Sequence, residues 1–316
     1  MTAGAAATPN LRNERWRLRL RNMRDFGRKF AGRSDGVVGL GLLLFFAFLA
    51  LAPDLLVGPL QTVTTATGSS LEPPSGTHLL GTDESGRDLL NMTIHGARIS
   101  MVIGLMATAI TIILGAVIGI VSGYVGGRWD QLLMRITDFF LVLPTFVLAI
   151  VLAPLILDLI GVDAEFMGIR ATLIVIVIVI GVTSWASTAR IIRSQAMSVR
   201  ERMFVDRARV IGGSSGHIMR RHILPNVLNL IVANTVLTFA AAVFTETTLS
   251  FIGLGDPSSP SWGQLLNAAQ ESGAPGLGAW WYIAPPAVCV VAVILAFTLV
   301  GNALDDVLNP KAGLKR

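Results

Sequence analysis

Charged residues and cysteine are both scarce in this chain of 316 residues. Charged residues make up 14% of it and hydrophobic residues 53%, whereas a soluble domain carries roughly 25% charge. This composition excludes an ordinary soluble domain and indicates a polytopic membrane protein. The single cysteine, Cys289, lies in an apolar run, so an intrachain disulfide framework or a cysteine zinc cluster is excluded.

The sequence signatures of ATP hydrolysis and of common hydrolases are also absent. None of the three lysines follows a glycine, so the chain has no P-loop of the form G-x-x-x-x-G-K-[ST]. It also lacks an H-E-x-x-H helix and Cys/His pairs at metal-ligand spacing. We therefore expect no enzyme activity, no catalytic residue, no cofactor and no metal site in this chain.

Six apolar stretches are long enough to cross a bilayer, which takes about 20 helical residues. Pro144 and Pro154 interrupt the third stretch, where neighbouring helices must satisfy the freed carbonyls. Gly115, Gly119 and Gly123 stand four apart in the second stretch and predict close contact with another helix. The predicted fold is an all-α integral membrane protein with six transmembrane helices, at 37–57, 99–123, 137–158, 171–189, 229–250 and 282–304.

Lysine and arginine are distributed unevenly between the two sides that these spans define. Nine of them fall in 11–33 and eight in 190–228, and 22 of the 25 lie on the side of the N-terminus. Because short cytoplasmic loops carry the excess of Lys and Arg, both termini are predicted to be cytoplasmic. The net charge of +5 therefore reflects membrane topology and does not indicate binding of nucleic acid.

The basic N-terminal segment has three interpretations. A cytoplasmic tail at 1–35 that fixes the topology is favoured over a helix lying on an anionic membrane surface. A signal peptide is the third interpretation, because Ala50-Leu51-Ala52 resembles a cleavage site. The apolar stretch 37–57 is too long for the core of a signal peptide, which favours a retained anchor.

A basic, mildly amphipathic segment at 201–228 interrupts the apolar sequence on the cytoplasmic side. Its pattern predicts a helix, a break at 212–216 and a short second helix that stops before Pro225. Apolar residues recur at helical spacing on one side of the first helix, opposite several arginines: Phe204, Val205, Ala208 and Ile211. Such a hairpin can pack one side on its own protein and leave the other side free for a partner.

This segment resembles the cytoplasmic EAA loop of binding-protein-dependent ABC transporter permeases. Asp206-Arg207-Ala208 stands for the E-A-A triplet, Gly212 for the glycine four residues later, and Leu224-Pro225 for the closing pair. The resemblance implies that this loop couples the chain to partner ATPases. The residues that it implicates are Asp206, Arg207, Ala208, Gly212, Gly213, His217, Arg220, Leu224 and Pro225.

The predicted external loop at 59–98 carries a longer motif. The stretch HLLGTDESGRDLL from His78 to Leu90, followed by Gly96-Ala97-Arg98-Ile99-Ser100, resembles a segment of the C-type permease subunit of dipeptide and oligopeptide importers. That family segment reads HPLGTDxxGRDxLxRxxxGxRxS, and Leu79 stands at its usual proline.

The residue types in this motif predict a loop that folds on itself. Gly81 and Gly86 suit tight turns, and Asp83 and Asp88 suit the N-caps of short helices. Arg87 and Arg98 can form ion pairs with these aspartates. We expect the ordered loop, together with 251–280, to offer a docking surface for a soluble binding protein. The residues proposed for that surface are Gly81, Asp83, Gly86, Arg87, Asp88 and Trp262.

Three further segments resemble the same family. Residues 246–255 match E-x-x-L-S-F-L-G-L-G and 257–263 match P-x-x-P-S-W-G, which contains Trp262. Glu246 is an ionisable group near the outer end of the fifth span, and it either faces a translocation path or makes an interhelical or interfacial contact. Asp138 lies in an R-x-x-D pattern before the third span and is expected to pair with Arg135 or to cap a helix.

With the stretch 301–310, which resembles GDxLRDxLDP of the same family, these motifs run from about residue 78 to residue 310. They imply the permease fold of a type I ABC importer. The implied assembly has a homologous permease subunit in a heterodimer, two ATP-binding subunits or domains that hold ATP and Mg, and an extracytoplasmic substrate-binding protein. Its implied location is the plasma (inner) membrane of a bacterium or archaeon. The implied layout is a tail at 1–35, the first helix and external loop at 36–98, a permease core at 99–310 and a tail at 311–316.

The substrate remains open at this stage. The resemblance favours dipeptides and oligopeptides, but nickel, a metal chelate or haem is the alternative within the same superfamily. A self-sufficient channel or secondary transporter is the rival of a different class, and it predicts internal inverted repeats and charges in mid-membrane. The sequence shows no clear repeat, which disfavours this rival.

Overall fold

The computed structural model describes residues 21, 24–25, 27–161, 164–166 and 168–308. Most of the basic N-terminal tail and the whole C-terminal tail at 311–316 lie outside the described residues. The interpretations of those two segments therefore stay predictions.

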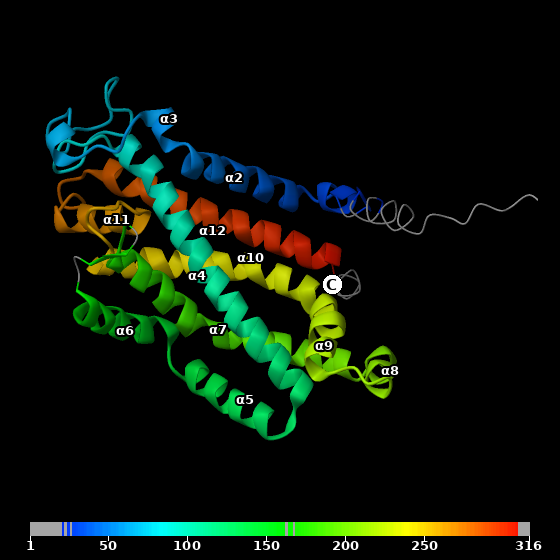
Figure 1. The fold of residues 1–316 in the computed structure, drawn as a ribbon. Coiled ribbons are helices and arrows are strands. Elements are labelled where there is room, and N and C mark those ends of the chain that lie inside the picture. The colour runs from blue at the N-terminus through cyan, green and yellow to red at the C-terminus, as the bar shows by residue number, and fades with distance from the viewer. Residues whose placement is uncertain (1–20, 22–23, 26, 162–163, 167, 309–316) are drawn as a thin grey trace, which may run out of the picture.

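Helices form almost all of the described structure, which confirms the all-α prediction (Figure 1). A small antiparallel hairpin, β1 (Glu165–Phe166) and β2 (Ile169–Arg170), precedes α7. The helices are α2 (Ser34–Leu51), α3 (Pro53–Val57), η1 (Val63–Thr65), α4 (Leu89–Val125), α5 (Gly127–Val142), α6 (Thr145–Ile160), α7 (Ala171–Arg200), α8 (Met203–Val210), α9 (Ser215–Ile218), η2 (Met219–Ile223), α10 (Leu224–Leu249), η3 (Ser250–Leu254), α11 (Trp262–Glu271) and α12 (Trp280–Leu308).

The described residues hold five segments that are long and apolar enough to cross a membrane, and α5 with α6 forms a sixth that is bent by 91°. The predicted number of spans is confirmed, and the predicted interruption of the third span at Pro144 is confirmed as a break between two helices. The third span also starts earlier than residue 137, at Gly127. Pro144 has no N–H to donate and forces an extended backbone on the residue before it. Leu143 accordingly has φ −78 and ψ 128, and α5 ends there. Pro154 is tolerated inside α6.

The first predicted span, 37–57, is likewise divided. Helix α2 ends at Leu51, and a separate short helix, α3, starts at Pro53. A proline is accepted at the start of a helix but not in its interior, so the break falls just before it.

Helix α4 crosses the whole molecule and packs along α7 (Figure 1). The small-residue positions of α4 face α7, and a Cβ built on Gly119 would lie 2.6 Å from the carbonyl oxygen of Ala189. Close helix contact at these glycines is therefore confirmed. Helix α12 packs with both α2 and α10, and all three contact α4 on one side of it. Helices α5 and α6 pack on α7 on the other side.

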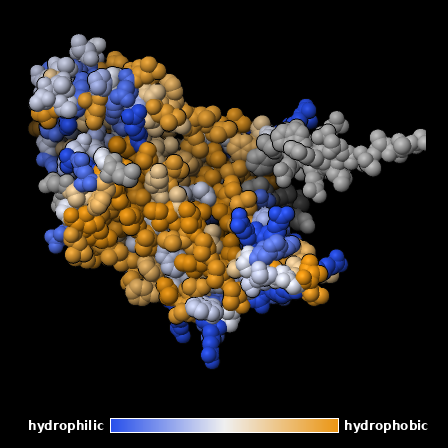
Figure 2. Space-filling view, viewed as in Figure 1, coloured by the Kyte–Doolittle hydropathy of each residue, from blue (hydrophilic) through white to orange (hydrophobic). Residues whose placement is uncertain are grey.

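The surface has the polarity expected of a membrane protein. Figure 2 shows a broad hydrophobic region over the middle of the molecule, with hydrophilic residues gathered at its two ends. One end carries the loop before α4 and helix α11, and the other carries α8 and α9. With the predicted topology, the first end is external and the second is cytoplasmic.

Candidate functional site

The cytoplasmic loop contains the helix and the break that the sequence predicts. Helix α8 follows α7 after a short bend, and the chain turns at Gly212, whose φ of +87 favours glycine. Helix α9 begins after Ser214, whose hydroxyl accepts a hydrogen bond from the backbone N–H of His217 at 3.4 Å. The loop therefore consists of two short helices joined by a turn, and it lies between two membrane helices.

The prediction that the second helix stops before Pro225 is wrong. The chain passes from α9 through the π-helical turn η2 into α10 without leaving the helix. Pro225 lies in the first turn of α10, where its missing N–H cannot donate to a carbonyl of the preceding turn. The wider π-helical turn just before it shifts the pattern of backbone hydrogen bonds at this position. The cytoplasmic loop is thus continuous with a membrane-spanning helix.

The apolar side of α8 is narrower than the spacing predicts. Val205 and Ala208 are buried against a core that includes Ile218 and Ile223. Ile211 is 84% exposed, because α8 has only eight residues and ends before it. Phe204 is also exposed, at 37%. Placing Phe204 and Ile211 on the buried side is therefore wrong.

On the free side of α8 and at its C-cap, three apolar side chains are at least 75% exposed: Met203, Val210 and Ile211. We call these three residues the α8 apolar group. Arginines 202, 207 and 209 lie in the same segment. Exposed apolar groups ringed by polar residues commonly mark a protein interface, so this cytoplasmic surface is suited to binding another protein.

The loop is also attached to the cytoplasmic end of α4. The guanidinium of Arg209 lies 5.4 Å from the centre of the Tyr124 ring and pairs with Asp206 at 3.1 Å. Arg200, at the end of α7, donates to the backbone carbonyl of Tyr124 at 3.2 Å. Sequence reasoning missed Tyr124, and an aromatic residue at the cytoplasmic end of a span was the available signal.

The other residues assigned to coupling lie around the same turn. The backbone N–H of Gly213 donates to the carbonyl of Ala208 at 2.9 Å, so the turn at Gly212 and Gly213 folds back against the end of α8. The rings of His217 and His222 lie 6.0 Å apart. Four other residues assigned to coupling are exposed on the cytoplasmic surface: Arg207, Arg220, Leu224 and Pro225.

The broken span α5–α6 is tied to α7 by ion pairs near the cytoplasmic side. Asp130 accepts two hydrogen bonds of 2.6 Å from the guanidinium of Arg193. Asp138 pairs with Arg190 at 2.6 Å, so the predicted pairing with Arg135 is wrong. The partner comes from α7 because α5 lies alongside that helix.

The external loop folds on itself as predicted. Gly81 and Gly86 have φ of +72 and +79 and form tight turns. The Oδ1 atom of Asp83 accepts from the backbone N–H groups of Ser85 and Arg87 at 2.8 Å each. The Oδ2 atom accepts from the Arg87 side chain at 2.6 Å. Asp83 is fully buried, so its direct role is to hold the loop together.

Asp88 caps the long helix α4 and not a short one. Its Oδ1 atom accepts from the backbone N–H groups of Leu90 and Asn91, and its Oδ2 atom lies 3.3 Å from Nδ1 of His78. The expected pairing of Arg98 with Asp83 or Asp88 is wrong. Arg98 instead contacts Asp54 at 3.5 Å, because it lies further along α4 beside the end of α2.

Trp262 is a buried anchor and not part of an exposed docking surface, so that expectation is wrong. Its side chain has no exposed area, and its ring N–H donates to the carbonyl of Thr93 at 3.0 Å. The ring packs edge-on against Phe46 at 5.6 Å between centroids. Trp262 therefore fixes the start of α11 against α2 and α4.

Glu246 is fully buried near the external end of α10. Its Oε1 atom accepts a hydrogen bond from the Ser250 hydroxyl at 2.9 Å, and its Oε2 atom accepts one from the Thr247 hydroxyl at 3.5 Å. Such donors are what a buried carboxyl group requires. In this conformation Glu246 is buried and hydrogen-bonded within its own helical segment, which does not fit a side chain that lines an open path.

Comparison with known proteins gives a consistent result. Residues 115–313 match the family described as the binding-protein-dependent transport system inner membrane component. The chain is 34% identical to the dipeptide transport system permease protein DppC of Bacillus subtilis, over 91% of this chain and 85% of that protein. It is 32% identical to the di/tripeptide permease DppC of Pseudomonas aeruginosa, over 92% of both chains.

A third relative is the oligopeptide permease OppC of Bacillus subtilis, which is 31% identical over 90% of this chain and 88% of that protein. These relatives span nearly the full length, and the family match covers the cytoplasmic loop, α10 and α12. The chain belongs to the family of binding-protein-dependent transport system inner membrane components.

Proposed function

We propose that this chain is the C-type permease subunit of an ATP-driven importer that carries dipeptides or oligopeptides into the cell. The α8 apolar group on the cytoplasmic side carries the proposal, because the described part of the chain leaves this apolar surface exposed. Relatives named as peptide permeases over about nine-tenths of the chain support the peptide substrate. The same names disfavour nickel, metal chelates and haem.

The cytoplasmic loop is the proposed point where ATP-driven motion enters the membrane domain. Two ATPase subunits or domains, holding ATP and Mg, dock on α8 and on the turn at Gly212. Arg209 and Arg200 connect this loop to the end of α4 at Tyr124, and η2 connects it to α10. A difference in how two ATPase states bind the loop can therefore shift the orientation of the spans.

The external end is the proposed docking surface for the binding protein. The folded loop at 59–98 and the segment 251–280 lie at the same end of the molecule (Figure 1). The buried Asp83–Arg87 pair and Trp262 keep this surface in shape. A homologous permease subunit completes the translocation path, and the bacterial inner membrane is the proposed location.

A pull-down of this chain from native membranes in a gentle detergent, followed by mass spectrometry, tests the assembly. We expect a second multi-span permease, a P-loop ATPase and an extracytoplasmic binding protein to co-elute. Peptide uptake by the reconstituted complex, with ATP and the binding protein, then tests the substrate. A stable homo-oligomer that transports without any ATPase would overturn the proposal and favour a channel or secondary transporter.

A further inference from the structure

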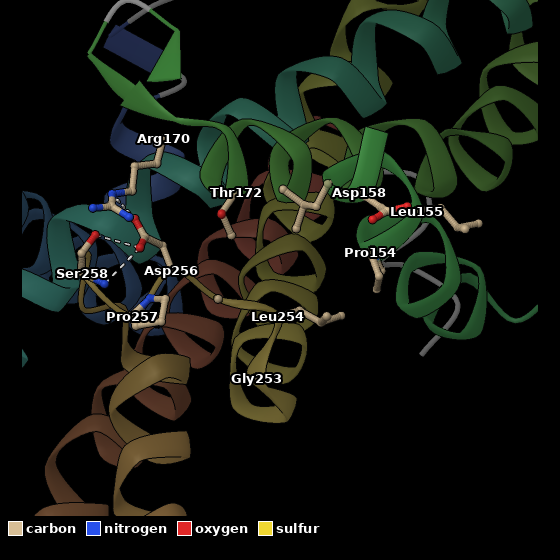
Figure 3. Close-up of a pocket in the computed structure, with 12 residues that line it drawn as sticks. Pro154, Leu155, Asp158, Arg170, Thr172, Gly253, Leu254, Asp256, Pro257 and Ser258 are labelled. Carbon is tan, nitrogen blue, oxygen red and sulfur yellow. Dashed lines mark hydrogen bonds and ion pairs between the residues drawn. The ribbon is translucent and has the colours of Figure 1, made fainter. Parts of the chain in front are cut away.

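A cavity of about 760 Å³ opens at the external end, between α6, the β1–β2 hairpin and the segment that follows η3. Figure 3 shows Arg170, Asp256 and Ser258 gathered at one end of this cavity, with Asp158 entering from α6 at the other. Its size is in the range of small-molecule pockets. The remaining walls are largely apolar, formed by Pro154, Leu155, Leu157, Leu254 and Pro257.

Asp256 is the buried acidic residue of this cavity and is 2% exposed. Its Oδ1 atom accepts from the backbone N–H and the hydroxyl of Ser258, at 3.0 and 2.8 Å. Its Oδ2 atom is buried and has no hydrogen-bond partner among the described residues. A buried carboxylate oxygen without a donor is unfavourable, so this atom can accept a further N–H group.

Arg170 covers that oxygen loosely. Its Nε atom lies 3.7 Å from Oδ2 of Asp256, which is longer than an N–H···O hydrogen bond. The arginine side chain is 41% exposed, whereas that of Asp256 is 1% exposed. Because Arg170 belongs to a strand of two residues and reaches into solvent, its side chain can leave Asp256 without disturbing a helix.

The balance of charge in the cavity favours a cation. Asp158 and Asp256 face it, and among the described residues Arg170 is the one basic side chain that lines it. Moving Arg170 aside leaves two carboxylates in a largely apolar surrounding, where a positive group is attracted strongly. An alkylammonium group has three N–H donors and matches the free acceptor on Asp256.

We propose that this cavity binds the protonated N-terminal amine of a peptide that enters the permease, with Asp256 as its counter-charge after Arg170 moves aside. The apolar walls then contact the first side chains of the peptide without selecting between different side chains. This inference rests on the proposed peptide substrate and adds to it a recognition site inside the permease.

The test uses the complete transporter in proteoliposomes with a reporter thiol on the cavity wall. Leu155, which is 56% exposed, is replaced by Cys, and Cys289 by Ser, so that the reporter is the only thiol of this chain. A membrane-impermeant maleimide is added from outside with increasing dialanine or N-acetyl-dialanine. We expect dialanine to slow the labelling and its acetylated form, which lacks the charge, to leave the rate unchanged.

Substitutions in the cavity should shift this protection in opposite directions. Asp256→Asn should raise the dialanine concentration for half-protection about tenfold or more, since a hydrogen bond to a charged group is lost. Arg170→Gln should lower the dialanine concentration for half-protection, because the competing cation is gone. Asp158→Asn, at an exposed carboxylate, should raise the same concentration. This variant tests the inference if Asp256→Asn does not fold.

Glu165→Gln is the matched control. Glu165 is exposed and lies opposite Arg170 in the hairpin, so this change removes the same charge without touching the cavity wall. Equal protection by both peptides, or the same half-protection in the Glu165 and both aspartate variants, would overturn the inference. ATP-dependent peptide uptake by the unsubstituted transporter separates the two proposals. Uptake without protection refutes the cavity alone, and no uptake of any peptide refutes the proposed function.

Discussion

The guanidinium of Arg193 in α7 donates two hydrogen bonds of 2.6 Å to the carboxylate of Asp130 in α5. Both side chains are largely buried, at 26% and 18% exposed. This pair holds the first half of the broken span against the helix that leads into the cytoplasmic loop. We therefore expect a displacement of the loop to reach α5 as well as α4.

Removing one member of this pair should destabilise the protein. Asp130→Asn leaves the guanidinium without its charged partner, and we expect a loss of about 1–3 kcal/mol. The matched control is Asp138→Asn, because the Asp138–Arg190 pair is more than half exposed and should contribute about 0–1 kcal/mol. Thermal unfolding of the purified protein in detergent measures both. Equal shifts for the two variants would contradict the structural role of Asp130.

Gly212→Leu should block ATP-dependent uptake while the chain still inserts into the membrane. A Cβ at this position meets no atom within 4 Å, so the effect comes from the positive φ of +87. An L-residue in that region costs about 1–2 kcal/mol, which favours a different turn. Gly212→Asn should retain more uptake, because asparagine tolerates this conformation. Normal uptake by the leucine variant at normal expression would show that the turn is not needed.

Ile211→Asp should weaken binding of the ATPase to the cytoplasmic loop. Burying an isoleucine side chain contributes about 1.5–3 kcal/mol, so we expect recovery of the ATPase in pull-downs to fall by about tenfold or more. Val63→Asp makes the same change at an exposed valine of the external loop and should leave that recovery unchanged. Undiminished recovery with Ile211→Asp would exclude the α8 apolar group as the docking surface.

Trp262→Ala should destabilise the external end strongly. A fully buried aromatic side chain contributes about 3–5 kcal/mol, and the hydrogen bond from its ring N–H to the Thr93 carbonyl is lost as well. The control is Trp280→Ala, since Trp280 is 64% exposed and should have a small effect. The melting temperature and the affinity for the binding protein should fall together for Trp262→Ala. A loss of affinity with an unchanged melting temperature would instead indicate direct contact with the binding protein.

Glu246→Gln should preserve transport, whereas Glu246→Leu should lower the stability by about 1–3 kcal/mol. The amide oxygen of glutamine can still accept from the hydroxyl of Ser250, but leucine leaves that buried hydroxyl without its partner. Thermal unfolding and peptide uptake in the same preparations measure the two effects. If Glu246→Gln stops uptake while the melting temperature stays the same, the carboxylate acts in translocation after all.

The sequence by itself determined the helical class and the number of spans, because apolar length acts through the bilayer and needs no tertiary contact. The distribution of arginine in addition predicts the cytoplasmic side. The sequence also determined the turns at Gly81, Gly86 and Gly212, since a positive φ is a local requirement. Its motifs further identified the family that the comparisons confirm.

Only the tertiary structure decided which side chains meet. Arg98 pairs with Asp54, and Asp138 with Arg190, because partners across helices depend on how the helices are rotated and offset. The burial of Trp262 and the exposure of Ile211 have the same origin, since periodicity gives the apolar side of a helix but not where the helix ends or what covers it. The cavity at Asp256 is the clearest case, because its walls come from segments about a hundred residues apart that only packing brings together.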